Sequence, residues 1–157
     1  MFRYTLLRDP EIIVVSHYGD YVGAEADKAM LFILGSRTLA ERHQLKFVIQ
    51  DFSAVEKMSL YDTDFSWQTR YFDKLKKLFE KQDLASIFNN ITVYQVKPDR
   101  IDIFDTLVLR EKKLRQYQEY QIDLIQRNSL AEALLALGEN KVPSEKDWIS
   151  PSETQND

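Results

Sequence analysis

Short apolar segments alternate with polar turns along the first part of the chain. Residues 2–7 and 11–18 are rich in β-branched and aromatic side chains, and an Asp-Pro step lies between them. This pattern predicts two strands joined as an antiparallel hairpin. Over residues 23–43 the apolar positions recur three and four apart, which predicts one helix that contains Gly35.

The middle of the chain continues the alternation of strand and helix. Residues 45–51 are apolar in their centre and predict a short strand, whereas residues 53–61 are of mixed character and predict a connection. Asp62 or Asp64 can cap the next helix, which we expect to extend to about residue 82 with a stripe of aromatic and leucine side chains.

The chain after residue 90 completes the pattern. Two segments, 91–96 and 120–125, predict strands that flank a helix over residues 100–117. Asn128 or Ser129 can cap a final helix, which a glycine then ends.

The predicted order of elements is β-β-α-β-α-β-α-β-α. Alternating strands and helices indicate an α/β fold with a mainly parallel sheet, and the opening hairpin adds an antiparallel edge, so the sheet is mixed. The length of 157 residues is typical of one domain, which we expect over residues 1–140. Residues 141–157 are polar and lack periodicity, so we expect a disordered tail there.

Composition narrows the classes of function. The net charge of −4, with acidic and basic residues interspersed, argues against a nucleic-acid partner. The chain has no cysteine, which removes disulfides, thiolate nucleophiles and cysteine metal sites. The N-terminus has no secretory pattern, and the longest apolar run, Ala29 to Leu34, is far too short for a transmembrane segment. We therefore expect a cytoplasmic protein.

The order of elements and four stretches of sequence resemble the STAS family, which includes the anti-sigma-factor antagonists. The resemblance is closer to the SpoIIAA-like branch, which is related in fold to the lipid-binding CRAL-TRIO domains. The stretches are EIIVVSHYGDY, KFVIQDFSAV, ITVYQVKPDRIDIFDTLVLR and YQIDLIQRNSLAEALLALG. The family's Asp-x-Ser-Gly-Val strand end is similar to the segment Asp51 to Val55, where alanine replaces the glycine.

This chain departs from the antagonists at one point. They carry an Asp-Ser-Ser-Gly segment a few residues after Asp-x-Ser, and its serine is phosphorylated. Here the segment reads Met-Ser-Leu-Tyr-Asp over residues 58–62. Ser59 within it and Ser53 before it remain as hydroxyls. A phosphate is favoured at a helix N-terminus, but Asp62 and Asp64 would oppose its charge.

The sequence also contains residues that could form a hydrolase triad or a metal site. His17, Asp51 and Ser53 are the residue types of a hydrolase triad, but no nucleophile-elbow motif is present, so we predict no catalytic residues. His17 with Asp20 and Glu25 would make a weak metal site, because the chain has only two histidines and no ligand cluster of known spacing. We therefore predict neither a metal nor a cofactor.

The candidate binding site lies around the connection after the third predicted strand. Ligands enter open α/β sheets at the carboxyl ends of strands. Trp67 belongs to the stripe that the next predicted helix needs for packing, whereas Tyr61, Phe65 and Phe72 fall outside it. The resemblance implies a partner protein or a small apolar or lipid-like ligand. The site residues are Asp51, Ser53, Ser59, Tyr61, Asp62, Phe65 and Trp67. The alternatives are a serine hydrolase using Ser53 or Ser59, and a homodimer formed through the aromatic surface.

Overall fold

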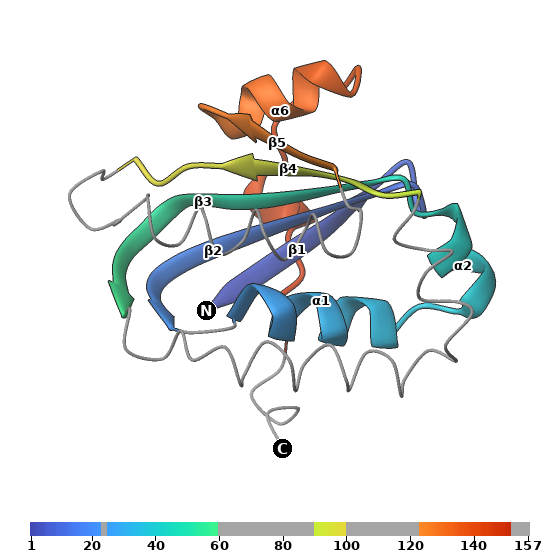
Figure 1. The fold of residues 1–157 in the computed structure, drawn as a ribbon, viewed down its shortest axis with the longest axis horizontal. Helices are drawn as coiled ribbons and strands as arrows, with labels where there is room; N and C mark the ends of the chain where they lie inside the picture. Colours follow the sequence, from blue (N-terminus) through green and yellow to red (C-terminus); the bar gives the residue numbers. More distant parts are fainter. Residues whose placement is uncertain (23–24, 60–89, 100–122, 152–157) are drawn as a thin grey trace.

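Five strands form one sheet in the order β1-β2-β3-β4-β5 (Figure 1). The computed structural model describes residues 1–22, 25–59, 90–99 and 123–151. Strand β1 is antiparallel to β2, and all other neighbours are parallel. The described elements are β1 (Phe2–Leu7), β2 (Ile12–Val22), α1 (Glu25–Gly35), α2 (Leu39–Gln44), β3 (Phe47–Ser59), β4 (Thr92–Val96), β5 (Asp123–Arg127), α6 (Leu130–Ala136) and a 3-10 helix (Glu145–Asp147). The predicted α/β fold with a mixed, mainly parallel sheet is confirmed.

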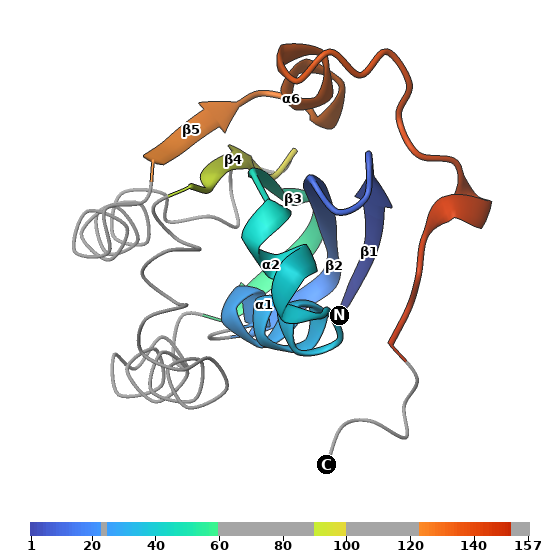
Figure 2. The ribbon, with the colours of Figure 1, turned by 90° about the vertical axis from the view of Figure 1, so that its right-hand side faces the viewer.

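Both faces of the sheet are covered, because the central strands are apolar on both sides. On β2, Ile13 and Val15 pack with α1, whereas Ile12 and Val14 pack with α6. Such continuous apolar runs are typical of parallel strands buried between two layers. Figure 2 shows α1 and α6 on opposite sides of the sheet. Among the described residues, no helix is long and apolar enough to cross a lipid bilayer.

The helix predicted over residues 23–43 is wrong as a single element. Helix α1 ends at Gly35, and α2 begins after Thr38, whose backbone is extended. The Thr38 side chain accepts a hydrogen bond from the Glu41 amide, and the Glu41 carboxylate accepts one from the Thr38 amide. This capping box starts a new helix, and the Arg42 Nε donates to the Leu34 carbonyl at 2.7 Å, which satisfies the end of α1.

Strands β2 and β3 are longer than predicted, and the connection predicted over residues 53–61 is strand as far as Ser59. The pairing of β3 with β2 shifts twice, so that Phe52 and Ser53 lie opposite the single residue His17, and Glu56 is an extra residue farther along. These bulges break the alternation of buried and exposed positions, which hides the strand from its sequence pattern. The helices predicted around residues 62–82 and 100–117 lie outside the described residues.

The final helix forms as its capping signals indicate. The Ser129 hydroxyl accepts a hydrogen bond from the Glu132 amide at 3.1 Å at the start of α6. Gly138 follows the helix with a positive φ of 80°, a conformation that favours glycine. The strand predicted over residues 120–125 is β5, which extends to Arg127, two residues beyond the prediction.

The polar segment after α6 returns to the edge of the sheet. Tyr4 and Ile149 exchange two backbone hydrogen bonds, with N–O distances of 2.9 and 2.8 Å. Trp148 packs against the core beneath α6. Within the segment 141–157, for which the sequence predicts disorder, these contacts hold Trp148 and Ile149 against the sheet. Residues 152–157 lie outside the described residues.

Candidate functional site at the carboxyl end of β3

Strand β3, together with β2, continues past β4 at one end of the sheet. Its last pair with β4 is Asp51 with Val96, whereas its pairing with β2 continues as far as Val22 and Ser59. Residues 17–22 of β2 and 52–59 of β3 therefore form a two-stranded extension, which curves away from β4 in Figure 1. The carboxyl ends of parallel strands are the usual place for sites in open α/β sheets.

A row of paired residues, four polar and one apolar, crosses the sheet where the extension begins. Residues paired across neighbouring strands project from the same face, and here the row lies on the face covered by α6. The row consists of Arg3, Ser16, Asp51, Val96 and Arg127. Ser16 and Asp51 are only 3% and 5% exposed. The apolar layer between the sheet and α6 therefore ends, at this edge, in the buried hydroxyl of Ser16 and the buried carboxyl of Asp51.

Asp51 is held by its own strand. Its Oδ1 accepts a hydrogen bond from the Ser53 amide at 3.0 Å, across the first bulge. Burial raises the pKa of the Asp51 carboxyl above its ordinary value, and the nearby Asp99 adds to this, whereas the Ser53 hydrogen bonds and Arg3 oppose it. The Asp99 amide in turn donates to the Ser53 carbonyl at 3.4 Å. The chain after β4 is therefore tied to the start of the extension.

The opposite face of the extension carries a buried aromatic cluster, formed by His17, Tyr21 and Phe52. The His17 ring stacks on Phe52 with centroids 4.8 Å apart and meets Tyr21 edge-on at 5.4 Å. Tyr21 also meets Phe52 edge-on at 5.3 Å. The His17 Nε2 and the Gln50 Oε1 are 2.7 Å apart in a buried hydrogen bond. This cluster fixes the extension to the body of the sheet.

The described residues do not assemble the hydrolase triad considered from the sequence. In such a triad a carboxylate orients the imidazole that takes the proton of the serine. Here His17 projects from the α1 face with Phe2 and Gln50, whereas Asp51 pairs with Ser16 and projects from the α6 face. The two side chains lie on opposite sides of the sheet. Within the described ranges, no group of three or more His, Asp or Glu side chains is placed to hold a metal ion.

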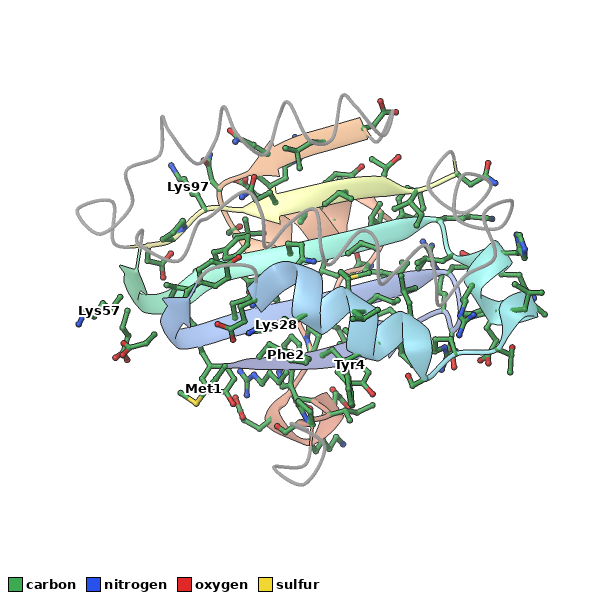
Figure 3. All side chains as sticks on the ribbon, turned by 60° about the horizontal axis from the view of Figure 1, so that its bottom comes forward. Met1, Phe2, Tyr4, Lys28, Lys57 and Lys97 are labelled. Carbon is green, nitrogen blue, oxygen red and sulfur yellow. The ribbon has the colours of Figure 1, made fainter. Side chains whose placement is uncertain are left out.

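The outer surface of the extension is polar and exposed. Ala54, Glu56 and Lys57 are exposed, while Val55 between them is buried with the aromatic cluster. Figure 3 shows Lys57 and Lys97 at this end of the sheet. Strand β3 therefore exposes one small and two charged side chains in the extension, and the aromatic cluster holds its other side against the protein.

Of the site residues predicted from sequence, the structure describes the side chains of Asp51 and Ser53, and the Asp51 carboxylate contacts the Ser53 backbone amide. Asp51 and Ser53 are joined by the hydrogen bond across the bulge. Strand β3 ends at Ser59, whose side chain lies outside the described part of the structure. The same is true of Tyr61, Asp62, Phe65 and Trp67.

Sequence reasoning did not include Ser16, and it weighed His17 only as a triad or metal residue. The signal was present, because these two polar residues directly follow the apolar run Ile-Ile-Val-Val. A polar pair at the end of a buried strand is a sign that the strand end has a role beyond packing.

Two solved structures are similar to this chain. The first is the anti-sigma factor antagonist SpoIIAA in its unphosphorylated form, with 10% identity, a TM-score of 0.45, and coverage of 88% of this chain and 97% of that chain. The second is an anti-sigma factor antagonist from Mycobacterium paratuberculosis, with 17% identity, a TM-score of 0.39, and coverage of 87% and 95%. No protein-family model and no curated protein matches the sequence.

Proposed function

We propose that this chain is a non-catalytic regulatory module that binds a partner protein at the extension of β2 and β3. The observation that carries the proposal is the position of Asp51 and Ser53 at the start of the extension, where β2 and β3 continue past β4. The sequence of this segment, KFVIQDFSAV, is also the one that resembles the regulatory STAS domains.

The hydrogen bonds of the site favour binding over catalysis. The Asp51 carboxyl accepts from its own strand, and the imidazole of His17 is buried beside Gln50 and two aromatic rings. Both groups are used to hold the backbone in place. A general base needs access to a substrate proton, which a fully buried imidazole does not have.

A strand held in this way is suited to recognition. Binding loses less conformational entropy when the contacting segment is already rigid. The aromatic cluster anchors one side of the extension, so Ala54, Glu56 and Lys57 project from an ordered backbone. Alanine permits close approach of a partner, and the two adjacent charges supply polar contacts.

The small apolar ligand expected from sequence depends on Phe65 and Trp67, which lie outside the described residues. We keep it as the second candidate because the described cluster of His17, Tyr21 and Phe52 already gives this end of the sheet an aromatic interior. Native mass spectrometry of protein purified without detergent separates the two candidates. A bound apolar molecule that is released only on denaturation would favour the ligand.

Site-specific photo-cross-linking tests the partner site. A photoreactive phenylalanine analogue is placed at Ala54 on the extension, and a matched control probe is placed at Leu135, which is 64% exposed on α6. The proposal expects a discrete cross-linked protein from the Ala54 probe and none from the Leu135 probe. The cross-linked protein is then purified and its affinity for this chain is measured.

The binding measurement decides the outcome. Ala54→Arg is expected to weaken binding of the purified partner by about ten-fold or more, whereas Leu135→Arg is expected to leave it within about two-fold. Equal affinity for Ala54→Arg and the unsubstituted chain would place the partner elsewhere. Circular dichroism of both variants shows whether the fold is retained.

A further inference from the structure

Residues 145–149, hereafter the docked segment, lie along the outer edge of β1. Strand β2 occupies the other side of β1, and the docked segment adds one antiparallel bridge through Tyr4 and Ile149. Figure 2 shows this part of the chain passing beside β1 after leaving α6. Exposed strand edges are sites where another extended chain can add hydrogen bonds.

Arg3 is the specific anchor for the docked segment. Its guanidinium carbon lies 4.6 Å from the centre of the Trp148 ring, and its Nη1 donates to the Glu145 carboxylate at 2.8 Å. A planar guanidinium can stack on an aromatic ring and bond a carboxylate at the same time. The edge of β1 therefore recognises a defined pattern, in which an acidic residue is followed three positions later by an aromatic residue.

The contacts of the docked segment are of a kind that can exchange. The Glu145 side chain is 86% exposed, so its ion pair with Arg3 is screened by water. Ile149 is 46% exposed and adds little burial of its own. The Arg3 Nε is buried without a hydrogen-bond partner among the described residues, so the guanidinium is not fully satisfied by the docked segment.

We propose that the edge of β1 with Arg3 is a docking site for an extended peptide from a partner protein, and that the docked segment occupies it as a resident competitor. The peptide carries a carboxylate and, three residues later, an aromatic side chain. This surface lies at the edge of the sheet, where Arg3 is two strands across from Asp51. Its assignment does not depend on the function proposed at the β3 extension.

The tether explains why a partner protein, and not a second copy, is the occupant. A segment joined to its site by residues 139–144 competes at an effective concentration of about millimolar. The identical segment of a second copy is present only at the protein concentration, so it does not displace the tethered one. A partner displaces it by satisfying Arg3 more fully or by holding additional contacts along β1.

Peptide binding to the full-length chain tests the proposal. The probe is a fluorescein-labelled synthetic peptide of residues 143–151, followed by fluorescence anisotropy. Ile149→Pro removes the amide that donates to Tyr4 and opens the edge, whereas Val142→Pro is a matched control at a position 52% exposed before the docked segment. We expect the peptide to bind Ile149→Pro about ten-fold or more tightly than it binds the unsubstituted chain or Val142→Pro.

Arg3 must carry the recognition. Adding Arg3→Ala to the Ile149→Pro chain is expected to weaken peptide binding by about five-fold or more. If Ile149→Pro does not fold, the double variant Glu145→Ala with Trp148→Ala opens the edge by removing only side chains. Adding Arg3→Ala to this double variant is expected to weaken peptide binding by the same factor. Hydrogen exchange at the Tyr4 amide shows that the edge is open.

Three results would overturn the proposal. One is equal affinity of the peptide for the unsubstituted chain and for a variant whose Tyr4 amide exchanges freely. Another is peptide binding that does not change on Arg3→Ala, because the site would then recognise backbone alone. A third is concentration-dependent dimerisation of the unsubstituted chain through exchange of the docked segment, which would make a second copy the occupant.

Discussion

Replacing Phe52 by leucine tests whether the aromatic cluster clamps the extension of β2 and β3. Phe52 is 2% exposed, and among the described residues its ring stacks on His17 and meets Tyr21 edge-on. Leucine keeps the position apolar and close in volume, so the main loss is that of the ring contacts. Aromatic pairs contribute about 0.5–1.5 kcal/mol each beyond the area they bury, so two pairs predict a loss of about 1–3 kcal/mol.

Phe47 provides a matched control for this substitution. It lies on the same strand, is half-buried, and makes one tilted ring contact with Tyr94 at a centroid distance of 6.4 Å. One such contact predicts a loss of about 0.5–1.5 kcal/mol for Phe47→Leu, which is half of the loss expected for Phe52→Leu. The free energy of unfolding is measured by urea denaturation for both variants, with equal slopes required before the two values are compared.

Hydrogen exchange then locates the effect of Phe52→Leu. If the cluster holds the extension, the amides of Tyr21 and Val55 are expected to lose protection before those of Val14 and Ile49 in the centre of the sheet. The reasoning is refuted if Phe52→Leu costs no more stability than Phe47→Leu. It is also refuted if protection falls evenly across β3, since the cluster would then stabilise the whole sheet.

Two further predictions concern Asp51 and Ser129. Burial raises the pKa of the Asp51 carboxyl in the folded state above its pKa in the unfolded state. Asp51 therefore stabilises the fold fully at a pH below its unfolded-state pKa, and this contribution is lost as the pH rises through its folded-state pKa. The Asp51→Asn side chain can still accept the hydrogen bond from the Ser53 amide. This variant is therefore expected to unfold at a higher temperature than the unsubstituted chain at pH 7, and the difference is expected to shrink toward pH 3. A lower midpoint of thermal unfolding at pH 7 would contradict this prediction. Ser129→Ala removes the N-cap of α6 and is expected to lower the free energy of unfolding, measured by urea denaturation, by about 1 kcal/mol. Ser129→Gly is expected to lower it by only a few tenths of this amount. Equal losses for the two variants would show that the effect does not come from the cap.

The elements with strong local signals could be predicted from sequence. The β1–β2 hairpin followed from two β-rich segments around a turn, and α6 followed from Ser129 as its cap. The break between α1 and α2 was missed because Thr38 lies inside an apolar pattern that continues past it. A capping box of Thr38 and Glu41 is a local signal, and it outweighs the periodicity around it.

The rest of the site depends on pairing across strands. Asp51 and Ser53 were found because their segment resembles a known motif, but the row that joins Arg3 to Asp51 requires the register of three strands. The extension of β3 was missed because two bulges interrupt the alternation of buried and exposed side chains by which a strand is predicted. The docking of residues 145–149 gave no periodic signal, since one bridge and one arginine hold it.

The first bulge of β3 also determines where this strand can change length. Phe52 and Ser53 lie opposite a single residue of β2, and Tyr18 already pairs with Ala54 beyond them. Loss of one residue at the bulge would leave every later pair unchanged, whereas loss of one residue between Phe47 and Asp51 would turn the following side chains to the other face. Over evolutionary time, insertions and deletions in β3 should therefore collect next to Asp51, so the geometry of the site can vary between species without refolding the sheet.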